Sequence, residues 1–388
     1  MVKDRNFTLF FEYFTREHFG KDPFLVPYYI GKALGYTVTI IFPEMDSNRD
    51  LPPELKGVKL LRLPLRGTEH SNHWVRYSEF YKYIWKNAPS IDVFMRFFDI
   101  PLSRASAIVY KMRNPQGKCY IKMDVNPMNI DKDFKQENKI LNFSGRVKLK
   151  LFDKISKYCV DVITCETKLA YDKLTNSRNI WNRWGDKLAI MSNGIDEELF
   201  SSFQLKEKKF GEKANVMITV SRLGTPQKNT PMLLRALEKV DLKDWTFYLI
   251  GSIDESLKPE IDSFYMRNPE KKHLVIFTGP VNDKKELCEF YNKSKVFVLT
   301  SRFEGFALVF NEARRFSNYL VTTPVGAYAD VLENGKYGDV VGLDDSEELA
   351  KKLQDIVNGK TNVDVYGGFD RQSLSWENYL KIVVDRLK

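Results

Sequence analysis

Strand-like and helix-like segments alternate along nearly the whole of the 388-residue sequence, and this alternation constrains the fold more than any other feature. Short apolar runs typical of buried strands, such as Val296–Ser301, are followed by stretches with helical spacing, such as Ser346–Val357. Strands that alternate with helices indicate a parallel β-sheet with helices packed on its faces. The pattern therefore predicts an α/β protein.

The length favours two domains, because single domains typically hold about 100–150 residues. A polar, lysine-rich stretch at residues 201–214 interrupts the alternation, which begins again at Asn215–Ser221. We therefore expect an N-terminal domain over residues 1–200 and a second domain over residues 213–371. Apolar side chains at helical spacing predict a final helix within residues 372–388.

Two glutamates, Glu304 and Glu312, are separated by seven residues at the point where a buried strand gives way to a helix. Glu304 follows the strand-like run Val296–Ser301, and Glu312 falls in the helix expected over Ala307–Phe316. Parallel sheets bind ligands at the carboxyl ends of their strands, and backbone N–H groups at such turns bind phosphate. Carboxylates accept hydrogen bonds from sugar hydroxyls. A site that offers both groups suits a sugar nucleotide.

This pair resembles the Glu-x7-Glu signature of the retaining glycosyltransferases of family 4, which have the GT-B fold. Other segments similar to motifs of the family occur in the same order, within residues 187–342: Ser192-Asn193-Gly194-Ile195-Asp196, Val220-Ser221-Arg222-Leu223 with Lys228-Asn229, and Pro324-Val325-Gly326 with Asp330 and Asn334-Gly335. The resemblance implies two Rossmann-like domains that face each other across a cleft. The N-terminal domain would bind the acceptor, the second domain the donor, and the C-terminal helix would pack back on the first domain.

The resemblance also implies roles in the donor site. Glu304 is expected to bind hydroxyls of the donor sugar close to the reacting carbon, and Glu312 to bind the ribose. Arg222 and Lys228 are expected to hold the donor diphosphate, because preorganised cations stabilise the charge of a leaving diphosphate. The alternative for these four residues is ordinary solvated charge. The other donor-binding residues expected are Asn193, Ser221 (where the family more often has Gly), Gly305, Phe306, Ala307 and Leu308.

The acceptor side departs from the family pattern, because the strand-like run Cys119–Asn126 lacks the histidine that many members carry. Its polar residues, Lys122 and Asp124, alternate with Met123, so both are expected to face the cleft. Asp124 either orients or deprotonates an acceptor hydroxyl, or it forms a structural ion pair or helix cap, and the sequence favours neither. Gly20, in the loop after the first strand, is expected to permit close approach of a ligand.

The basic excess lies almost entirely in the first half of the chain. Residues 1–200 contain 32 Lys or Arg and 24 Asp or Glu, whereas residues 201–388 contain 28 and 27. Such an excess favours an anionic partner. No nucleic-acid motif accompanies it, so we expect a glycan or lipid-diphosphate-linked acceptor, and a possible anionic membrane surface, but no nucleic acid. The segment Asp131-Lys132-Asp133 has the spacing of a metal-binding Asp-x-Asp motif, but it does not end an apolar strand. We therefore expect no metal.

We expect a cytoplasmic protein. The alternative is a cytoplasmic protein that is peripherally attached to the inner face of the cell membrane. The sequence has no run of 18 apolar residues, no signal-peptide pattern and no closely spaced cysteine pair among its four cysteines.

The segment Ser144–Cys159 predicts an amphipathic helix. Its apolar face would hold Val147, Leu151, Phe152, Ile155, Tyr158 and Cys159, and its basic face Arg146, Lys150, Lys154 and Lys157. We favour an apolar face that packs on the N-terminal sheet, as in most soluble domains. The other interpretation is a helix that lies on an anionic membrane.

The expected activity is retaining, metal-independent hexosyl transfer from a nucleoside diphosphate sugar to a glycan or lipid-linked glycan, in bacterial surface polysaccharide biosynthesis. By analogy with the family, retention would come from front-face attack assisted by the leaving diphosphate. The alternatives are a GT-B-like nucleotide-sugar epimerase and a non-catalytic nucleotide-sugar-binding subunit. The intact set of Arg222, Lys228, Glu304 and Glu312 argues against the subunit.

Overall fold

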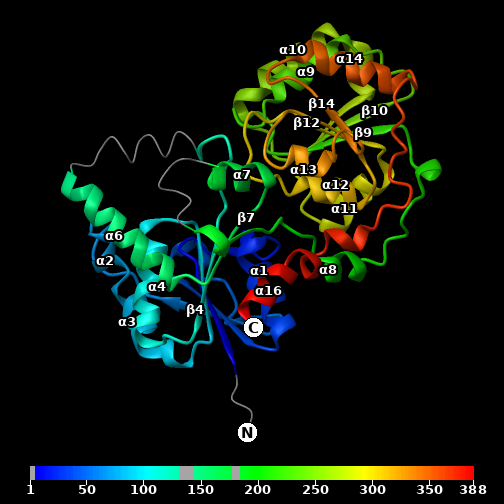
Figure 1. Ribbon diagram of the computed structural model, residues 1–388. Coiled ribbons are helices and arrows are strands. Elements are labelled where there is room, and N and C mark those ends of the chain that lie inside the picture. The colour runs from blue at the N-terminus through cyan, green and yellow to red at the C-terminus, as the bar shows by residue number, and fades with distance from the viewer. Residues whose placement is uncertain (1–4, 131–142, 177–183) are drawn as a thin grey trace. The chain divides into compact units, whose positions relative to one another are not determined.

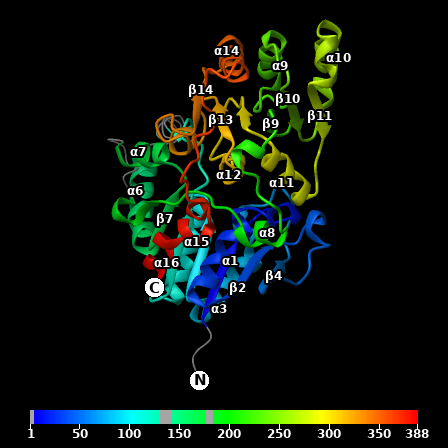
Figure 2. The ribbon, with the colours of Figure 1, turned by 90° about the vertical axis from the view of Figure 1, so that its right-hand side faces the viewer.

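The chain forms two compact α/β units. The structure, a computed structural model, describes residues 5–130, 143–176 and 184–388 (Figure 1). The first unit comprises Met1–Asp196 and Trp376–Lys388, and the second comprises Glu197–Ser375. In each unit helices cover both faces of one sheet (Figure 2).

The first unit is built on an eight-stranded sheet of order β3-β4-β2-β1-β5-β6-β7-β8. All neighbouring strands are parallel except the short pair β3 and β4. In β1, Phe7 and Leu9 enter the core on one side of the sheet, and Phe10 enters the core on the other. The strands are β1 (Asn6–Phe10), β2 (Thr37–Pro43), β3 (Glu54–Leu55), β4 (Val58–Leu63), β5 (Val93–Phe97), β6 (Lys118–Lys122), β7 (Val162–Cys165) and β8 (Leu188–Ile190).

Helices connect these strands and cover the sheet. The helix α1 ends at Gly35, which has the left-handed conformation, with φ of 70°. The C-terminal helices α15 and α16 pack against α1, so the end of the chain belongs to the first unit. The helices are α1 (Asp22–Leu34), α2 (His73–Arg76), α3 (Ser78–Asn87), α4 (Pro101–Arg113), α6 (Phe143–Cys159), α7 (Lys168–Asn176), α15 (Trp376–Tyr379) and α16 (Lys381–Leu387).

The Asn-Gly-Ile-Asp segment joins the returning C-terminal segment to the first unit. A Cβ on Gly194 would lie 2.6 Å from the backbone nitrogen of Trp376, so only glycine fits there. The Trp376 N–H donates to the carbonyl of Ile195 at 3.2 Å. Asp196 accepts a hydrogen bond from the Tyr29 hydroxyl at 2.6 Å. This motif therefore has a structural role within the first unit.

The helix α6 is present as predicted, but the prediction that its apolar face packs on the sheet is wrong. Val147, Leu151 and Tyr158 are exposed, by 51%, 58% and 74%. The buried face instead contains Asp153, which pairs with Arg104 of α4. A buried carboxylate needs such a partner, so this ion pair sets the rotation of the helix about its axis. The side chain of Arg146 lies outside the described part of the helix.

The second unit is built on a six-stranded parallel sheet of order β11-β10-β9-β12-β13-β14. The strands are β9 (Val216–Val220), β10 (Thr246–Ile250), β11 (Val275–Gly279), β12 (Val296–Leu299), β13 (Tyr319–Thr322) and β14 (Gly338–Val340). The helices are α8 (Glu197–Ser202), α9 (Thr230–Lys239), α10 (Lys258–Arg267), α11 (Lys284–Lys293), α12 (Val309–Arg315), α13 (Tyr328–Leu332) and α14 (Ser346–Val357). The predicted strand at Val296–Ser301 and helix at Ser346–Val357 are both confirmed.

The strand order reverses between β9 and β12. From β9 the chain builds outward to β11, and it then returns to place β12 on the other side of β9. Open parallel sheets bind ligands outside the carboxyl ends of the strands at such a reversal. The loops that follow β9 and β12 therefore occupy the position where a ligand site is expected.

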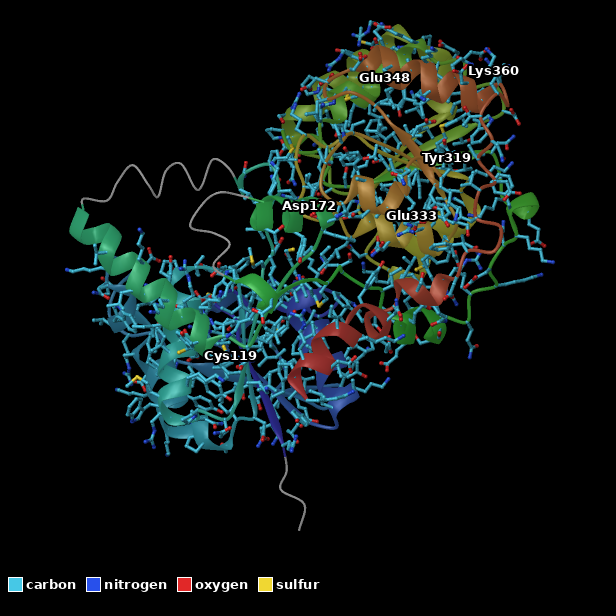
Figure 3. The ribbon with its side chains drawn as sticks, viewed as in Figure 1. Cys119, Asp172, Tyr319, Glu333, Glu348 and Lys360 are labelled. Carbon is cyan, nitrogen blue, oxygen red and sulfur yellow. The ribbon has the colours of Figure 1, made fainter. Side chains whose placement is uncertain are left out.

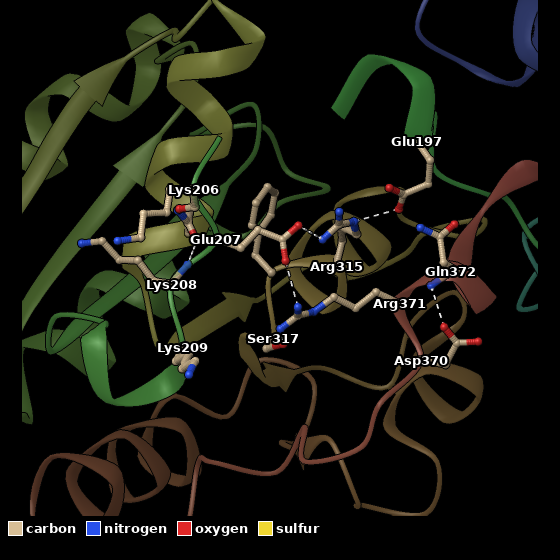
Figure 4. Close-up of polar contacts among 12 residues, drawn as sticks. Glu197, Lys206, Glu207, Lys208, Lys209, Arg315, Ser317, Asp370, Arg371 and Gln372 are labelled. Carbon is tan, nitrogen blue, oxygen red and sulfur yellow. Dashed lines mark hydrogen bonds and ion pairs between the residues drawn. The ribbon is translucent and has the colours of Figure 1, made fainter. Parts of the chain in front are cut away.

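An ion-pair network holds α12 to the two ends of the second unit (Figure 4). Arg315 of α12 donates to Glu197 at 2.7 Å and pairs with Glu207 at 2.7 Å. Arg371 binds the other oxygen of Glu207 at 2.8 Å and the Ser317 hydroxyl at 3.0 Å. The helix that carries Glu312 is thus fixed to the segments by which the chain enters and leaves the unit.

Candidate functional site

The loops after β9 and β12 bring Lys228 and Glu304 into direct contact. The Lys228 ammonium pairs with Oε1 of Glu304, which also accepts a hydrogen bond from the Ser301 hydroxyl at 2.6 Å. Glu304 is 7% exposed, so its charge depends on these partners. The two residues are 76 positions apart in the sequence, and the neighbouring positions of β9 and β12 bring them together.

Gln227 links this ion pair to Arg222. Its side-chain amide donates to Oε2 of Glu304 at 3.2 Å and to the carbonyl of Phe303 at 3.0 Å. Its oxygen accepts a hydrogen bond from the Arg222 guanidinium at 3.2 Å. Arg222, Lys228 and Glu304 therefore form one network, in which the exposed Arg222 is the cation more open to a ligand.

The turn between Glu304 and α12 has an uncommon backbone. Ala307 has φ of 68°, a left-handed conformation that residues other than glycine seldom adopt. Gly326, from the Pro324-Val325-Gly326 motif, packs against this turn, and a Cβ there would lie 2.9 Å from the carbonyl oxygen of Phe306. Strained residues of this kind cluster at ligand sites. Gly305, Ala307 and Leu308 are half-buried and Phe306 is buried.

Glu312 lies in α12 and is held from α11. The hydroxyl of Tyr291 donates to Oε2 of Glu312 at 2.9 Å, and the Lys284 ammonium lies 3.9 Å from Oε1. Burial raises the pKa of the Tyr291 phenol well above its usual value, so this group remains a donor. The carboxylate of Glu312 is 23% exposed. One oxygen is thus fixed, and the other remains accessible to a ligand hydroxyl.

Lys122, which was expected to face the cleft on the acceptor side, is an internal residue of the first unit. Its ammonium is fully buried at the end of β6, where it binds Asp22 at 2.7 Å and also binds Glu166. Alternation along a strand gives the face of a residue but not the depth of its side chain. Burial raises the pKa of Glu166 to about 7, although the nearby Lys122 ammonium opposes the shift.

The other residues expected outside the donor loops all lie in the first unit. Asp124 is exposed just beyond β6. Gly20 is exposed, and a Cβ on it would meet no atom within 4 Å, so packing does not require glycine there. Asn193 is buried and donates to Glu166 at 2.9 Å. Ser221, in contrast, lies beside Arg222 in the second unit and is half-buried.

The described residues contain no group of three or more His, Cys, Asp or Glu side chains arranged to hold a metal ion. The Asp131-Lys132-Asp133 segment lies outside the described residues. In the same described ranges, no helix is both long and apolar enough to cross a bilayer.

The family model for glycosyl transferases group 1 matches residues 214–358, which include both site loops. The chain is 24% identical over 335 residues to a probable sucrose-phosphate synthase of Thermosipho melanesiensis, a match that covers 81% of this chain and 76% of that protein. It is 25% identical to the capsular polysaccharide biosynthesis glycosyltransferase CapM of Staphylococcus aureus, over 62% of this chain and 63% of the relative.

Residues 214–358 therefore match the group 1 glycosyltransferase family, and the chain is a glycosyltransferase. Solved structures show that this glycosyltransferase has the GT-B fold. A glycosyltransferase from Rickettsia africae superposes with a TM-score of 0.71 at 14% identity, over 100% of this chain and 98% of that one. HepE of Anabaena, solved in complex with UDP-glucose, superposes with a TM-score of 0.67 at 14% identity, over 98% and 99% of the two chains.

Three residues around the expected site of this glycosyltransferase were not predicted from the sequence: Ser301, Gln227 and Tyr291. Ser301 and Gln227 are neighbours of motif residues, so their position beside Glu304 and Lys228 was the available signal. Tyr291 belongs to no motif, and only the packing of α11 against α12 brings it to Glu312. The hydrogen bond from its hydroxyl joins two residues that are distant in the sequence, and sequence periodicity cannot reveal such a contact.

Proposed function

We propose that this glycosyltransferase moves a hexosyl group, with retention, from a nucleoside diphosphate sugar to a glycan or lipid-diphosphate-linked glycan in bacterial surface polysaccharide biosynthesis. The observation that carries the proposal is the network of Arg222, Gln227, Lys228 and Glu304 at the reversal of strand order. It places two cations and a carboxylate where a parallel sheet binds a ligand.

The network supports the transfer step by charge and by geometry. As the bond from the anomeric carbon to the diphosphate breaks, negative charge grows on the leaving oxygen, and Arg222 and Lys228 would stabilise it. The acceptor hydroxyl oxygen bonds to the same face of that carbon, and its proton passes to the departing diphosphate. Both oxygens of Glu304 already accept hydrogen bonds, so we assign it to positioning of the sugar and not to nucleophilic attack.

Related proteins support the donor and acceptor classes. HepE was solved with UDP and glucose as well as with UDP-glucose. CapM and the amylovoran glycosyltransferase AmsD of Erwinia amylovora act in polysaccharide biosynthesis by their names. A Campylobacter jejuni transferase, 30% identical over 38% of this chain, is named for a glycan on undecaprenyl diphosphate. We infer by analogy a uridine diphosphate sugar and an anionic, lipid-linked acceptor.

The test is release of free nucleoside diphosphate from a panel of nucleotide sugars, without acceptor and with either a lipid-diphosphate-linked glycan or a soluble sugar phosphate. Release that depends on the lipid-linked glycan is the expected result. Release that depends on the sugar phosphate would instead favour an acceptor like that of sucrose-phosphate synthases.

Two results contradict the transferase proposal. Epimerised sugar or an elimination product, formed without acceptor, identifies an epimerase. Binding of nucleotide sugars without turnover under every condition identifies a binding subunit. Inversion of the anomeric configuration in the product, read by proton NMR, contradicts the retaining mechanism alone.

A further inference from the structure

The helix α6 separates its side chains into an inner and an outer face. The inner face holds Asp153, which pairs with Arg104 of α4, and Ser156, which is fully buried. Arg104 also stacks 5.6 Å from the centre of the Phe152 ring. Figure 1 shows α6 beside α4, as these contacts require. The side of the helix that meets the first unit is therefore built around a buried ion pair.

The outer face carries an apolar row. Val147, Leu151, Ile155 and Tyr158 are 51%, 58%, 42% and 74% exposed. At about 100° per residue they fall within an arc of about 80°. Single exposed apolar residues are ordinary, but a row of four on one helix face needs an explanation.

Lysines border this row on both sides. Lys150 and Lys154 are exposed along one border, with the half-exposed Lys157, and Lys148 is exposed along the other. The acid of α6 is Asp153, whose charge is buried against Arg104. Among the described side chains of α6, the solvent-facing charges are therefore all positive. The arrangement matches a helix that lies in a membrane interface, with apolar side chains at its centre and cations at its borders.

We propose that the outer face of α6 docks on an anionic lipid bilayer. The apolar row would enter the boundary between headgroups and acyl chains, and Lys148, Lys150 and Lys154 would contact lipid phosphates. Charge complementarity selects this occupant over a second copy of the chain, because a two-fold contact between two such faces would bring lysines against lysines. The proposal is independent of the donor site, which lies in the other unit.

The experiment is sedimentation of the full chain with vesicles that contain no glycan acceptor. Wild type should bind vesicles of phosphatidylcholine with increasing phosphatidylglycerol, should ignore pure phosphatidylcholine, and should be released by high salt. A lysine near an anionic surface strengthens partitioning about fivefold, so Lys148→Gln/Lys150→Gln/Lys154→Gln should weaken binding about a hundredfold. Leu151→Gln/Ile155→Gln should weaken it at least tenfold. Melting temperatures should change little, since all five side chains are exposed.

Matched controls in other parts of the surface separate docking from general charge and hydrophobicity. Lys258→Gln/Lys272→Gln/Lys351→Gln removes the same charge from the second unit, and Met266→Gln/Ile382→Gln removes two exposed apolar side chains. Both controls should bind like wild type.

Three outcomes overturn the proposal. The first is wild type that ignores anionic vesicles at low salt. The second is a loss of binding in the controls as large as in the α6 variants. The third is a dimer, measured by analytical ultracentrifugation, that Leu151→Gln/Ile155→Gln abolishes while vesicle binding persists.

Discussion

Replacement of Tyr291 by phenylalanine tests whether Glu312 binds the donor, because this change removes the hydrogen bond that holds the carboxylate and leaves the carboxylate itself. The phenol is 1% exposed and donates to Glu312 at 2.9 Å. A hydrogen bond to a charged group contributes about 1.5–3 kcal/mol. Because Glu312 is 23% exposed, water can replace part of the loss, so we expect the low end of this range.

If the binding free energy falls by about 1.5 kcal/mol because Glu312 is less well positioned, the affinity for nucleoside diphosphate weakens roughly tenfold. Isothermal titration calorimetry with UDP and GDP measures it, with Glu312→Ala as the larger loss for comparison. If Tyr291→Phe binds nucleotide as wild type does while Glu312→Ala does not, the phenol has no positioning role. If neither change affects affinity, the ribose role of Glu312 is refuted.

The same sheet supplies a matched control. Tyr319, labelled in Figure 3, begins β13, and its hydroxyl donates to Asp339 at 3.0 Å. Tyr319→Phe removes an equivalent bond at the amino end of the strands, opposite the site loops. It should lower the melting temperature about as much as Tyr291→Phe does and should leave nucleotide affinity unchanged. Equal losses of affinity in the two variants would show that the effect is general destabilisation.

Four further results are expected. Arg222→Ala or Lys228→Ala should lower turnover about a hundredfold in the diphosphate-release assay, and near-normal rates in both would remove them from the donor site. Glu304→Gln should lower turnover far more than nucleotide affinity, and the reverse order contradicts a contact with the sugar. Activity should survive EDTA, because these cations supply the charge at the diphosphate; loss in EDTA that manganese restores would identify a metal requirement. Burial lowers the pKa of Lys213 to about 7, so the folded protein binds fewer protons than the unfolded chain between about pH 7 and 10. Stability should therefore rise by up to about 2 kcal/mol from pH 7 to 9, and Lys213→Met should lack this rise in denaturant titrations.

The strands were predictable because a parallel strand buried on both faces is a continuous apolar run, as Val296–Leu299 shows. Strand order was not predictable, because the sequence does not state which strands are neighbours. The contact of Lys228 with Glu304 depends on that order, since it requires β9 beside β12. The motif resemblance supplied the pair of residues, and the sheet explains why they meet.

Burial of charge was the other property that the sequence could not supply. Lys122 was expected to face the cleft, and its position in the sequence did not indicate that Asp22 and Glu166 bind its buried ammonium. These partners come from the start of α1 and the end of β7, and no local pattern brings them together. A buried charge needs such distant partners, so its position is a property of the fold and not of the segment.

The same physics explains why the apolar face of α6 points outward. Periodicity shows that a helix has two faces, but not which of them meets the core. An apolar row would normally face the core, because the burial of apolar side chains is favourable and the burial of a carboxylate is not. The fully buried Arg104 of α4 binds two carboxylates, Asp99 and Asp153, and the second of them brings α6 against α4. Once Asp153 is inside, the row from Val147 to Tyr158 must remain outside. The exposed apolar side chains of α6 are unfavourably hydrated in water, and their transfer to an apolar surface is favourable. This favourable transfer is the physical reason to expect a membrane at the outer face of α6.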